Sequence, residues 1–314
     1  MSANVIDWLL EKNEPAVRYF TLVDLLDHKK NDREASTALS QIPRRGFAAR
    51  LLKNQRKDGS WFSRSDLYLP KYNATNWRMI VLSDLGMDKR DERIRRGCEA
   101  FFDEWFKPDD KENVLRGGGE LCISGNLART LARCGYADDQ RVKKLFDWIV
   151  EHQKEDGGWH CFPSNTGTLD CWEGLAAYAA LPRQKWTRRI KRSAERGAEF
   201  YLERRLFREG SRRYAPWFRF HYPNHYYYDV LVGLDTITSI GYGGDKRLRE
   251  ATKILKSKRR ADGRWNMDAV HPDLGPGASY HIRRKVEPLV LERAGAPSKL
   301  ITLRALRVLN RVDE

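Results

Sequence analysis

Residues 152–161 read HQKEDGGWHC, and the Asp-Gly-x-Trp inside this stretch decides the fold. Related versions stand at residues 54–61 (NQRKDGSW) and 257–265 (SKRRADGRW), each at the end of a stretch patterned like a charged helix. Glycine lets the backbone turn tightly after a helix, so the motif marks the same kind of loop three times. Recurrence of this kind indicates an internal repeat.

A second phrase recurs in step with the first. It reads LGMDKRDERI at residues 85–94, CGYADDQRV at 134–142 and IGYGGDKRL at 240–248. Each glycine stands where a helix C-cap favours a positive φ, and the aspartates that follow suit the N-cap of the next helix. Asp58 and Asp156 are 98 residues apart, and Asp156 and Asp262 are 106 apart. One repeat unit is therefore close to 50 residues and is expected to be a helical hairpin.

The hydrophobic pattern separates apolar inner helices from charged outer helices. Inner helices are expected near 16–26, 74–85, 123–134, 168–181 and 226–240, and outer helices near 32–54, 91–106, 139–153, 184–204 and 245–258. The last helix, 298–311, has the pattern of an inner helix, and 4–12 is its candidate outer partner. Pairing the first helix with the last would close a ring of six hairpins. Strand signals are nearly absent, so the sequence predicts one all-α toroid over residues 1–314.

Composition predicts a soluble globular protein. The chain has 314 residues, of which 41% are hydrophobic, and it can bury a sizeable core. It lacks an apolar stretch long enough to span a bilayer, and it does not begin with a basic region followed by an apolar one. Its five cysteines are an odd, widely spaced set without CxxC, which suits a reducing compartment. We therefore expect a cytoplasmic protein, of an oligomeric state that the sequence does not indicate.

The formal net charge of +15, from 58 Lys and Arg against 43 Asp and Glu, bears on the choice of partner. The basic residues are spread along the chain with acidic and apolar residues between them, which is typical of solvated helix faces. Nucleic acid stays open as a partner but is not favoured, because no helix-turn-helix, finger or RNP-like motif accompanies the charge.

The tryptophan loops resemble a known motif. QRKDGSW at 55–61 and QKEDGGW at 153–159 are similar to the QW motifs of squalene and hopene cyclases, whose repeats are shared by the β subunits of protein prenyltransferases. The third copy has Lys258 where glutamine would stand. The chain as a whole resembles short bacterial proteins labelled prenyltransferase and squalene-oxidase repeat proteins. This resemblance implies an α/α toroid with an apolar central cavity, and the motif concerns the scaffold more than the chemistry.

Physical reasoning gives the loops a structural role. The glutamine at the end of an outer helix can hydrogen-bond the unpaired N–H groups at the start of a neighbouring helix. The tryptophan then covers the seam between adjacent hairpins.

In the toroids that the chain resembles, the N-terminal ends of the inner helices form the rim of the cavity. The corresponding segments here are rich in aromatic and polar residues: 68–77 (YLPKYNATNW), 120–126 (ELCISGN), 160–173 (HCFPSNTGTLDCWE), 219–229 (RFHYPNHYYYD) and 279–285 (SYHIRRK). Such residues on one rim predict a pocket, although they can also simply cap and pack. The candidate ligand-binding residues are Tyr72, Trp77, Asn126, Trp172, His225, Tyr227, Tyr228, Arg219 and Arg283.

A cationic cyclase needs an acid and aromatic faces that stabilise a carbocation. The DxDD motif of squalene-type cyclases is absent, and LDCWE at 169–173 is a distant echo of the DCxxE variant. Asp170 and Glu173 share a helical face, so each can raise the pKa of the other. These two and Asp229 are the candidate catalytic residues, with plain helix starts as the alternative. Full triterpene cyclisation is not expected, because the chain has residues for only one ring.

Metal and anion sites are further alternatives. The zinc site of the prenyltransferases needs an Asp, a Cys two residues on and a later His, whereas Asp170 and Cys171 are adjacent. No metal site is predicted, and Cys161, Asp170, Cys171 and His225 are the weak candidates if Zn or Mg binds. A diphosphate or other anion could meet the rim cations Lys71, Arg129, Arg219, Arg283, Arg284 and Lys285.

The leading hypothesis is a toroid that binds an isoprenoid-like or other apolar ligand, with or without an anionic diphosphate head, in its central cavity. Catalysis stays open, as a cyclase-like or prenyltransferase-like reaction. The alternative is a non-enzymatic scaffold that binds protein or nucleic acid through its ring face or basic surface.

Overall fold

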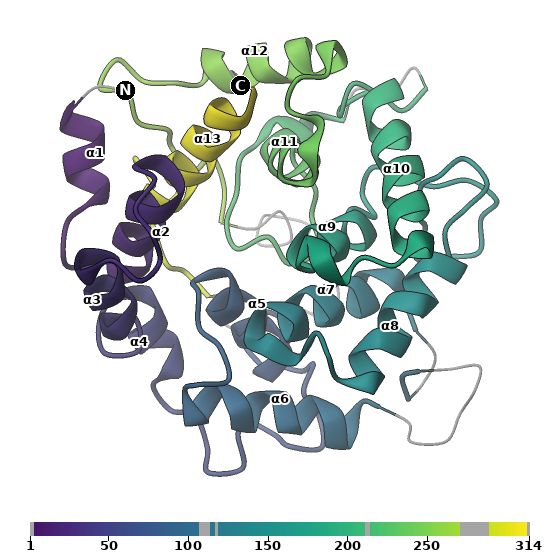
Figure 1. Cartoon of the computed structure of the whole chain (residues 1–314), viewed down its shortest axis with the longest axis horizontal. Coiled ribbons are helices and arrows are strands. Elements are labelled where there is room, and N and C mark those ends of the chain that lie inside the picture. Colours follow the sequence, from purple (N-terminus) through teal and green to yellow (C-terminus); the bar gives the residue numbers. More distant parts are fainter. Residues whose placement is uncertain (1–2, 107–113, 117–118, 211–213, 271–288, 313–314) are drawn as a thin grey trace.

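The computed structural model describes residues 3–106, 114–116, 119–210, 214–270 and 289–312, and over these residues the fold is all-α. The described part of the chain has only isolated bridges in place of strands. Figure 1 shows the helices in two layers. The inner layer holds α2 (Pro15–Leu25), α5 (Thr75–Asp84), α7 (Leu121–Leu131), α9 (Glu173–Ala180), α11 (Val230–Ile237) and α13 (Lys299–Val312). The all-α prediction is therefore confirmed, and the count of six closed hairpins stays a prediction.

The outer layer carries the charged helices. It holds α1 (Ala3–Leu9), α3 (Arg33–Gln41), α4 (Gly46–Leu52), α6 (Glu92–Glu104), α8 (Gln140–Glu151), α10 (Arg188–Glu203) and α12 (Arg249–Ser257). Among the described residues, every helix is too short or too polar to cross a lipid bilayer.

The inner helices pack on one another in chain order, α5 on α7, α7 on α9, α9 on α11 and α11 on α13. The last helix, α13, also packs on α2, and α1 packs on α2. At the start of α13 the Lys299 ammonium lies 2.7 Å from a carboxylate oxygen of Glu11, just after α1. Residues near the two ends of the chain are thus in direct contact.

The turn between inner and outer helix has the residues that its backbone requires. Gly86, Gly135 and Gly241 have φ values of +85°, +92° and +94°, which favour glycine. Asp91 and Asp139 then cap α6 and α8, each accepting a hydrogen bond from the N–H two residues on. The expected hairpin turn is confirmed at these positions.

Several expected helices differ from the structure in their bounds. The outer helices expected from 184 and 245 begin at Arg188 and Arg249. The outer helix expected over 32–54 is two helices, because Pro43 and Gly46 interrupt it and Gly46 has a φ of +71°. The Glu14 carboxylate then accepts a hydrogen bond from the Phe47 N–H at 2.8 Å, at the start of α4. The inner helices expected from 168 and 226 begin only at Glu173 and Val230, since the residues before them form loops that enter the ring.

The tryptophan loops join adjacent hairpins, with the hydrogen bonds reversed from the expectation. The Gln153 amide donates from Nε2 to the carbonyl of Gly157 at 2.7 Å and to that of Ser193, in α10, at 2.8 Å. Gln55 repeats this pair of bonds, with the second one to the Arg93 carbonyl in α6. The glutamine is therefore a donor to carbonyls, and the Oε1 of Gln55 has no hydrogen-bond partner among the described residues.

The third tryptophan loop has an arginine where the other two have glutamine. Arg259, and not Lys258 as expected, stands at the equivalent position before Trp265. The Arg259 Nε donates to the Gly263 carbonyl at 3.3 Å, while the Lys258 ammonium pairs with Asp268 at 2.7 Å. The tryptophans of all three loops, Trp61, Trp159 and Trp265, are buried.

Candidate functional site

A pocket of about 1150 Å³ opens at the N-terminal ends of α7 and α9. We call it the rim pocket. It brings together six of the residues singled out from the sequence, namely Lys71, Cys161, Asp170, Cys171, Glu173 and Tyr227. Aromatic side chains supply much of the wall: Tyr68, Trp105, Phe162, Tyr214, Tyr226 and Tyr227.

Glu173 is the buried acid of the rim pocket. It is the first residue of α9 and only 1% exposed, and neither carboxyl oxygen has a hydrogen-bond partner in the described part of the chain. Burial raises its pKa well above 4.5, and the nearby sulfur of Cys161 adds to that rise. The carboxyl group is thereby favoured in its neutral, proton-donating form.

Close packing of two inner helices holds Glu173 in place. A side-chain carbon at Gly125 of α7 would lie 2.7 Å from the carbonyl carbon and oxygen of Glu173. Glycine thus lets the α7 and α9 backbones approach each other.

Asp170, the other half of the expected acid pair, lies at the same pocket. Its Oδ1 accepts a hydrogen bond from the Trp217 indole N–H at 2.7 Å. Its charge adds a smaller contribution to the raised pKa of Glu173, after burial and Cys161. Asp170 precedes α9 and so does not share a helical face with Glu173, but its charge raises the pKa of Glu173 in the expected direction.

Three cysteines meet beside Glu173. The Cys161 sulfur accepts a hydrogen bond from the Cys122 N–H at 3.3 Å, and the Cys171 thiol donates to it at 3.6 Å. The Cys122 thiol itself donates to Glu120 at 3.7 Å. Interactions with Cys122 and then with Cys171 lower the pKa of Cys161. All five cysteines of the chain are free thiols.

Three of the weak metal candidates, Cys161, Asp170 and Cys171, line the rim pocket, whereas His225 does not. Over the described residues, no group of three or more His, Cys, Asp or Glu side chains is arranged to hold a metal ion. His225 lies apart from Cys161 and Cys171, where it stacks on Tyr72 with a ring separation of 5.5 Å.

Several candidate ligand residues instead hold the loop 221–229 inside the ring. The Asn126 amide donates to the His225 carbonyl at 2.6 Å, and the Trp172 indole donates to the Tyr226 carbonyl at 3.0 Å. Trp77 is fully buried and packs edge-on against the His225 ring. Burial lowers the pKa of His225 to about 3, so its imidazole is neutral.

Among the described residues, the remaining candidates lie outside the lining of the rim pocket. The Tyr228 hydroxyl donates to the Leu206 carbonyl at 2.8 Å. The Asp229 carboxylate, 1% exposed, accepts from the Val232 N–H at 2.8 Å as the N-cap of α11 and pairs with the His221 ring at 2.7 Å. Arg219 is exposed, and Arg283 lies outside the described residues.

A second cavity, of about 480 Å³, lies on the other side of the loop 221–229, toward the C-terminal ends of α5, α7, α9 and α11. We call it the central cavity. Trp172 lines it, whereas the adjacent residues Cys171 and Glu173 line the rim pocket. The loop and the start of α9 therefore divide the middle of the ring into two chambers.

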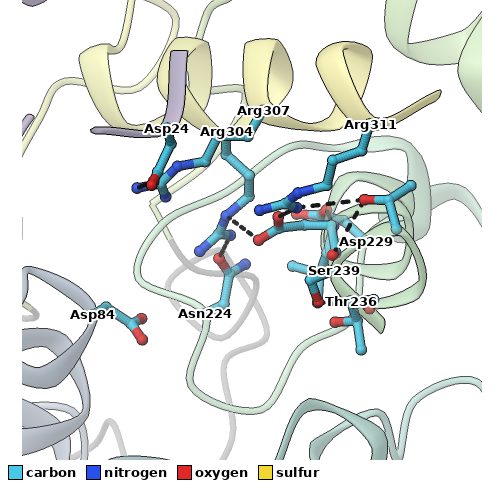
Figure 2. Close-up of polar contacts among 12 residues, drawn as sticks. Asp24, Asp84, Asn224, Asp229, Thr236, Ser239, Arg304, Arg307 and Arg311 are labelled. Atoms are coloured by element: carbon cyan, nitrogen blue, oxygen red, sulfur yellow. Dashed lines mark hydrogen bonds and ion pairs between the residues drawn. The ribbon is translucent and has the colours of Figure 1, made fainter. Parts of the chain in front are cut away.

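Charged side chains line the central cavity, in contrast to the apolar lining expected from the resemblance. Figure 2 shows Arg304, Arg307 and Arg311 extending from α13. Arg304 and Arg311 share Asp235 of α11, at 3.4 and 2.8 Å, and Arg307 pairs with Asp24 of α2 at 2.5 Å. These ion pairs join α13 to both of its neighbours.

Cations outnumber carboxylates in the central cavity. Its described lining holds Lys30, Arg90, Arg129, Arg133, Arg304, Arg307 and Arg311 against Asp24, Asp84, Asp88 and Asp235. Arg129 is buried and stacks over Trp172 at 4.8 Å, and its Nε has no hydrogen-bond partner in the described part of the chain. The described lining of this cavity therefore has a positive net charge.

Sequence reasoning missed part of the rim pocket. Cys122 stands in the segment 120–126, which the residue pattern did single out, but its proximity to Cys161 depends on packing between separate units. Glu209 lines the pocket and accepts a hydrogen bond from the Leu169 N–H at 2.9 Å. Trp105 comes from the end of α6, where nothing in the sequence distinguishes it from a core tryptophan.

Comparison with known proteins gives structural likeness only. No protein-family model matches the sequence, and no curated protein matches it. Among solved structures, a protein from Actinoplanes is 15% identical over 99% of this chain and 98% of its own, with a TM-score of 0.46. A variant of the type II terpene cyclase MstE from Scytonema, in complex with its substrate geranylgeranyl dihydroxybenzoate, is 15% identical over 96% and 86%, with a TM-score of 0.44. At this level the likeness carries no statement about activity.

Proposed function

We propose that the chain binds a neutral, isoprenoid-like molecule in the rim pocket and that Glu173 donates a proton to it. The observation that carries this proposal is the buried Glu173 carboxyl, which lines the pocket with neither oxygen hydrogen-bonded among the described residues. A general acid works best when its pKa is raised toward the working pH. Burial raises the pKa of Glu173 in this direction.

The charges of the rim pocket favour a neutral ligand over one with a diphosphate head. Its described lining has four carboxyl groups, of Glu120, Asp170, Glu173 and Glu209, against the cations of Lys71 and Arg116. Carboxylates repel an anionic head but stabilise positive charge that develops on the ligand. The anionic head considered from the sequence would suit the central cavity better.

The aromatic wall supports the same chemistry. Proton transfer to an alkene or epoxide leaves positive charge on carbon, and the faces of aromatic rings stabilise a cation. The rings of Tyr226 and Tyr227 line the pocket together with Glu173. The pocket volume of about 1150 Å³ suits a long ligand. A single toroid of helices offers little shielding of a polycyclic cation from water, so the proposal does not extend to full polycyclisation.

Proton transfer can be tested with geranylgeraniol and its terminal epoxide as probes. The full chain is incubated with each probe in D₂O, and products are analysed for deuterium on carbon by gas chromatography and mass spectrometry. Quenching of intrinsic fluorescence measures binding separately. We expect the wild type to bind the probes and incorporate deuterium, and Glu173→Gln to bind them without incorporation.

The control is Glu195→Gln, which changes an exposed glutamate of α10 and should behave as the wild type. Binding without deuterium in the wild type would refute the proton transfer. A chain that binds neither probe, but binds RNA more tightly as the salt concentration falls, would instead be the scaffold considered from the sequence.

A further inference from the structure

In the cluster of Cys122, Cys161 and Cys171, one sulfur accepts hydrogen bonds from both of the other cysteines. Cys122 is the second residue of α7, and the first-turn N–H groups of a helix have no partner within the helix. Its N–H points to the Cys161 sulfur at 3.3 Å, and the Cys171 thiol points to the same sulfur at 3.6 Å. Cys161 is thus the acceptor at the centre of the cluster.

An acceptor at the start of a helix is more stable as an anion. The positive end of the helix dipole and the free N–H groups stabilise a thiolate, and hydrogen bonds to a charged acceptor are about twice as strong as neutral ones. The Cys122 thiol, and after it the Cys171 thiol, lower the pKa of Cys161 well below its usual range. The cluster therefore favours a negative charge on Cys161.

Other charged groups around Cys161 act in both directions. The titratable and charged groups that line the same pocket are Tyr68, Lys71, Arg116, Glu120, Cys122, His160, Asp170, Cys171, Glu173, Glu209, Tyr214, Tyr226 and Tyr227. His160 lowers the pKa of Cys161 further. The carboxylates oppose a thiolate by repulsion, and Glu173 opposes it least in its neutral form.

We propose that Cys161 is a reactive thiolate that attacks small disulfides entering the rim pocket, and that Cys171 resolves the product. Cys161 is half-buried and lines the pocket, so a small molecule can reach its sulfur. The other two cysteines of the chain, Cys98 and Cys134, are fully buried and lie outside this pocket. This site rests on the pocket and not on proton transfer by Glu173.

The reaction balances with the small disulfide as the oxidant. The Cys161 thiolate attacks one sulfur of R–S–S–R, forms a mixed disulfide and releases a thiolate that takes a proton from water. The Cys171 thiol then loses its proton to water, attacks the Cys161 sulfur and expels the second R–S⁻, which is also protonated. Two protein thiols are oxidised and R–S–S–R is reduced to two R–SH. The two sulfurs must move from 3.6 Å to a bond length of about 2.05 Å.

Alkylation of the native, full-length chain tests the thiolate. Iodoacetamide is applied between pH 5.5 and 8.5, and peptide mass spectrometry follows each cysteine. At pH 6 we expect Cys161 to react about tenfold or more faster than Cys122 and Cys171, because an ordinary thiol is almost fully protonated there. Cys98 and Cys134 serve as internal controls and should react only after unfolding. Equal rates in the pocket, or reaction of Cys161 only above pH 8, would overturn the proposal.

A matched pair of variants tests the hydrogen-bonded order. Cys171→Ser keeps a donor beside Cys161, whereas Cys171→Ala removes it. We expect the pH midpoint of Cys161 alkylation to rise in Cys171→Ala and to move less in Cys171→Ser. A merely structural cysteine would shift neither midpoint.

Bis(2-hydroxyethyl) disulfide, a small neutral disulfide, tests the resolving step. The wild type should form a disulfide between Cys161 and Cys171, and Cys171→Ala should keep a hydroxyethylthio adduct on Cys161. An adduct on Cys122, or none on Cys161, would refute the assignment. Neither assay needs an apolar ligand, so both stand or fall independently of the probes used for Glu173.

Discussion

The buried Glu173 gives the stability of the fold a pH dependence with a definite sign. Below pH 4.5 its carboxyl is protonated in both the folded and the unfolded chain. Above pH 4.5 the unfolded chain releases this proton while the folded chain keeps it, because the folded-state pKa is raised well above 4.5. The unfolded state then binds fewer protons, so the free energy of unfolding falls as pH rises.

The size of this effect follows from the proton that the folded chain retains. One retained proton costs about 1.4 kcal/mol per pH unit, so the full slope from pH 5 to pH 7 amounts to about 2.7 kcal/mol. Glu173→Gln keeps the shape of the side chain and does not titrate. We expect the stability of the wild type relative to Glu173→Gln to fall by up to that amount between pH 5 and pH 7.

Denaturation with guanidinium chloride at pH 5, 6 and 7, followed by tryptophan fluorescence, measures the difference. An amide in the buried position shifts the stability of Glu173→Gln by a constant, so only the slope is informative. Glu195→Gln, on the exposed face of α10, is the control. The difference in stability between the wild type and Glu195→Gln should not change with pH. A difference between wild type and Glu173→Gln that is flat with pH would show that Glu173 ionises normally in the folded chain.

Three further changes test the scaffold and the central cavity. Gln153→Glu should lower the free energy of unfolding by about 2 kcal/mol, because it loses two hydrogen bonds to carbonyls. The control Gln140→Glu, on the exposed side of α8, should change it by less than about 0.5 kcal/mol in the same melts. Gly125→Ala should cost about 2 kcal/mol or more, because its methyl group would meet the α9 backbone at 2.7 Å; a wild-type melting curve would contradict the close approach of α7 and α9. Inorganic phosphate should raise the melting temperature more than chloride does at equal ionic strength. Arg129→Gln should lose this rise in melting temperature, whereas Arg93→Gln on α6 should keep it. An equal loss in both variants would exclude the central cavity as the binding site.

Local backbone chemistry explains why so much of the scaffold was predictable. Gly86, Gly135 and Gly241 stand at positive φ, and Asp91 and Asp139 cap the helices that follow. Each of these constraints acts within a few residues, so the sequence displays it directly. Their repetition at a spacing of about 50 residues then predicts the hairpins.

The division of the ring into two chambers depends on contacts between units and could not be predicted in this way. The hydrogen bonds of Asn126 and Trp172 to the loop 221–229 span up to 99 residues of sequence. A helix pattern indicates which face turns inward but not which loop fills the space between the inner helices.

One signal for the charged cavity was present in the sequence. Arg304, Arg307 and Arg311 are three and four residues apart and so form a single stripe on α13. The apolar residues of the same helix favoured an inner position, which implied an apolar lining. Ion pairs with aspartates of the neighbouring helices α2 and α11 let this arginine stripe face the cavity.

The two proposed sites of the rim pocket are electrostatically coupled. After burial, the charge of Cys161 is the largest cause of the raised pKa of Glu173. Any reaction that neutralises the Cys161 thiolate should therefore lower the folded-state pKa of Glu173 and make it a stronger acid. The test compares Cys161→Ser with the double variant that also carries Glu173→Gln. The stability difference between these two chains should stop falling at a lower pH than the difference between the wild type and Glu173→Gln. An unchanged end point would mean that the Cys161 sulfur carries no charge near Glu173, and the reactive thiolate would then be refuted without any assay of its chemistry.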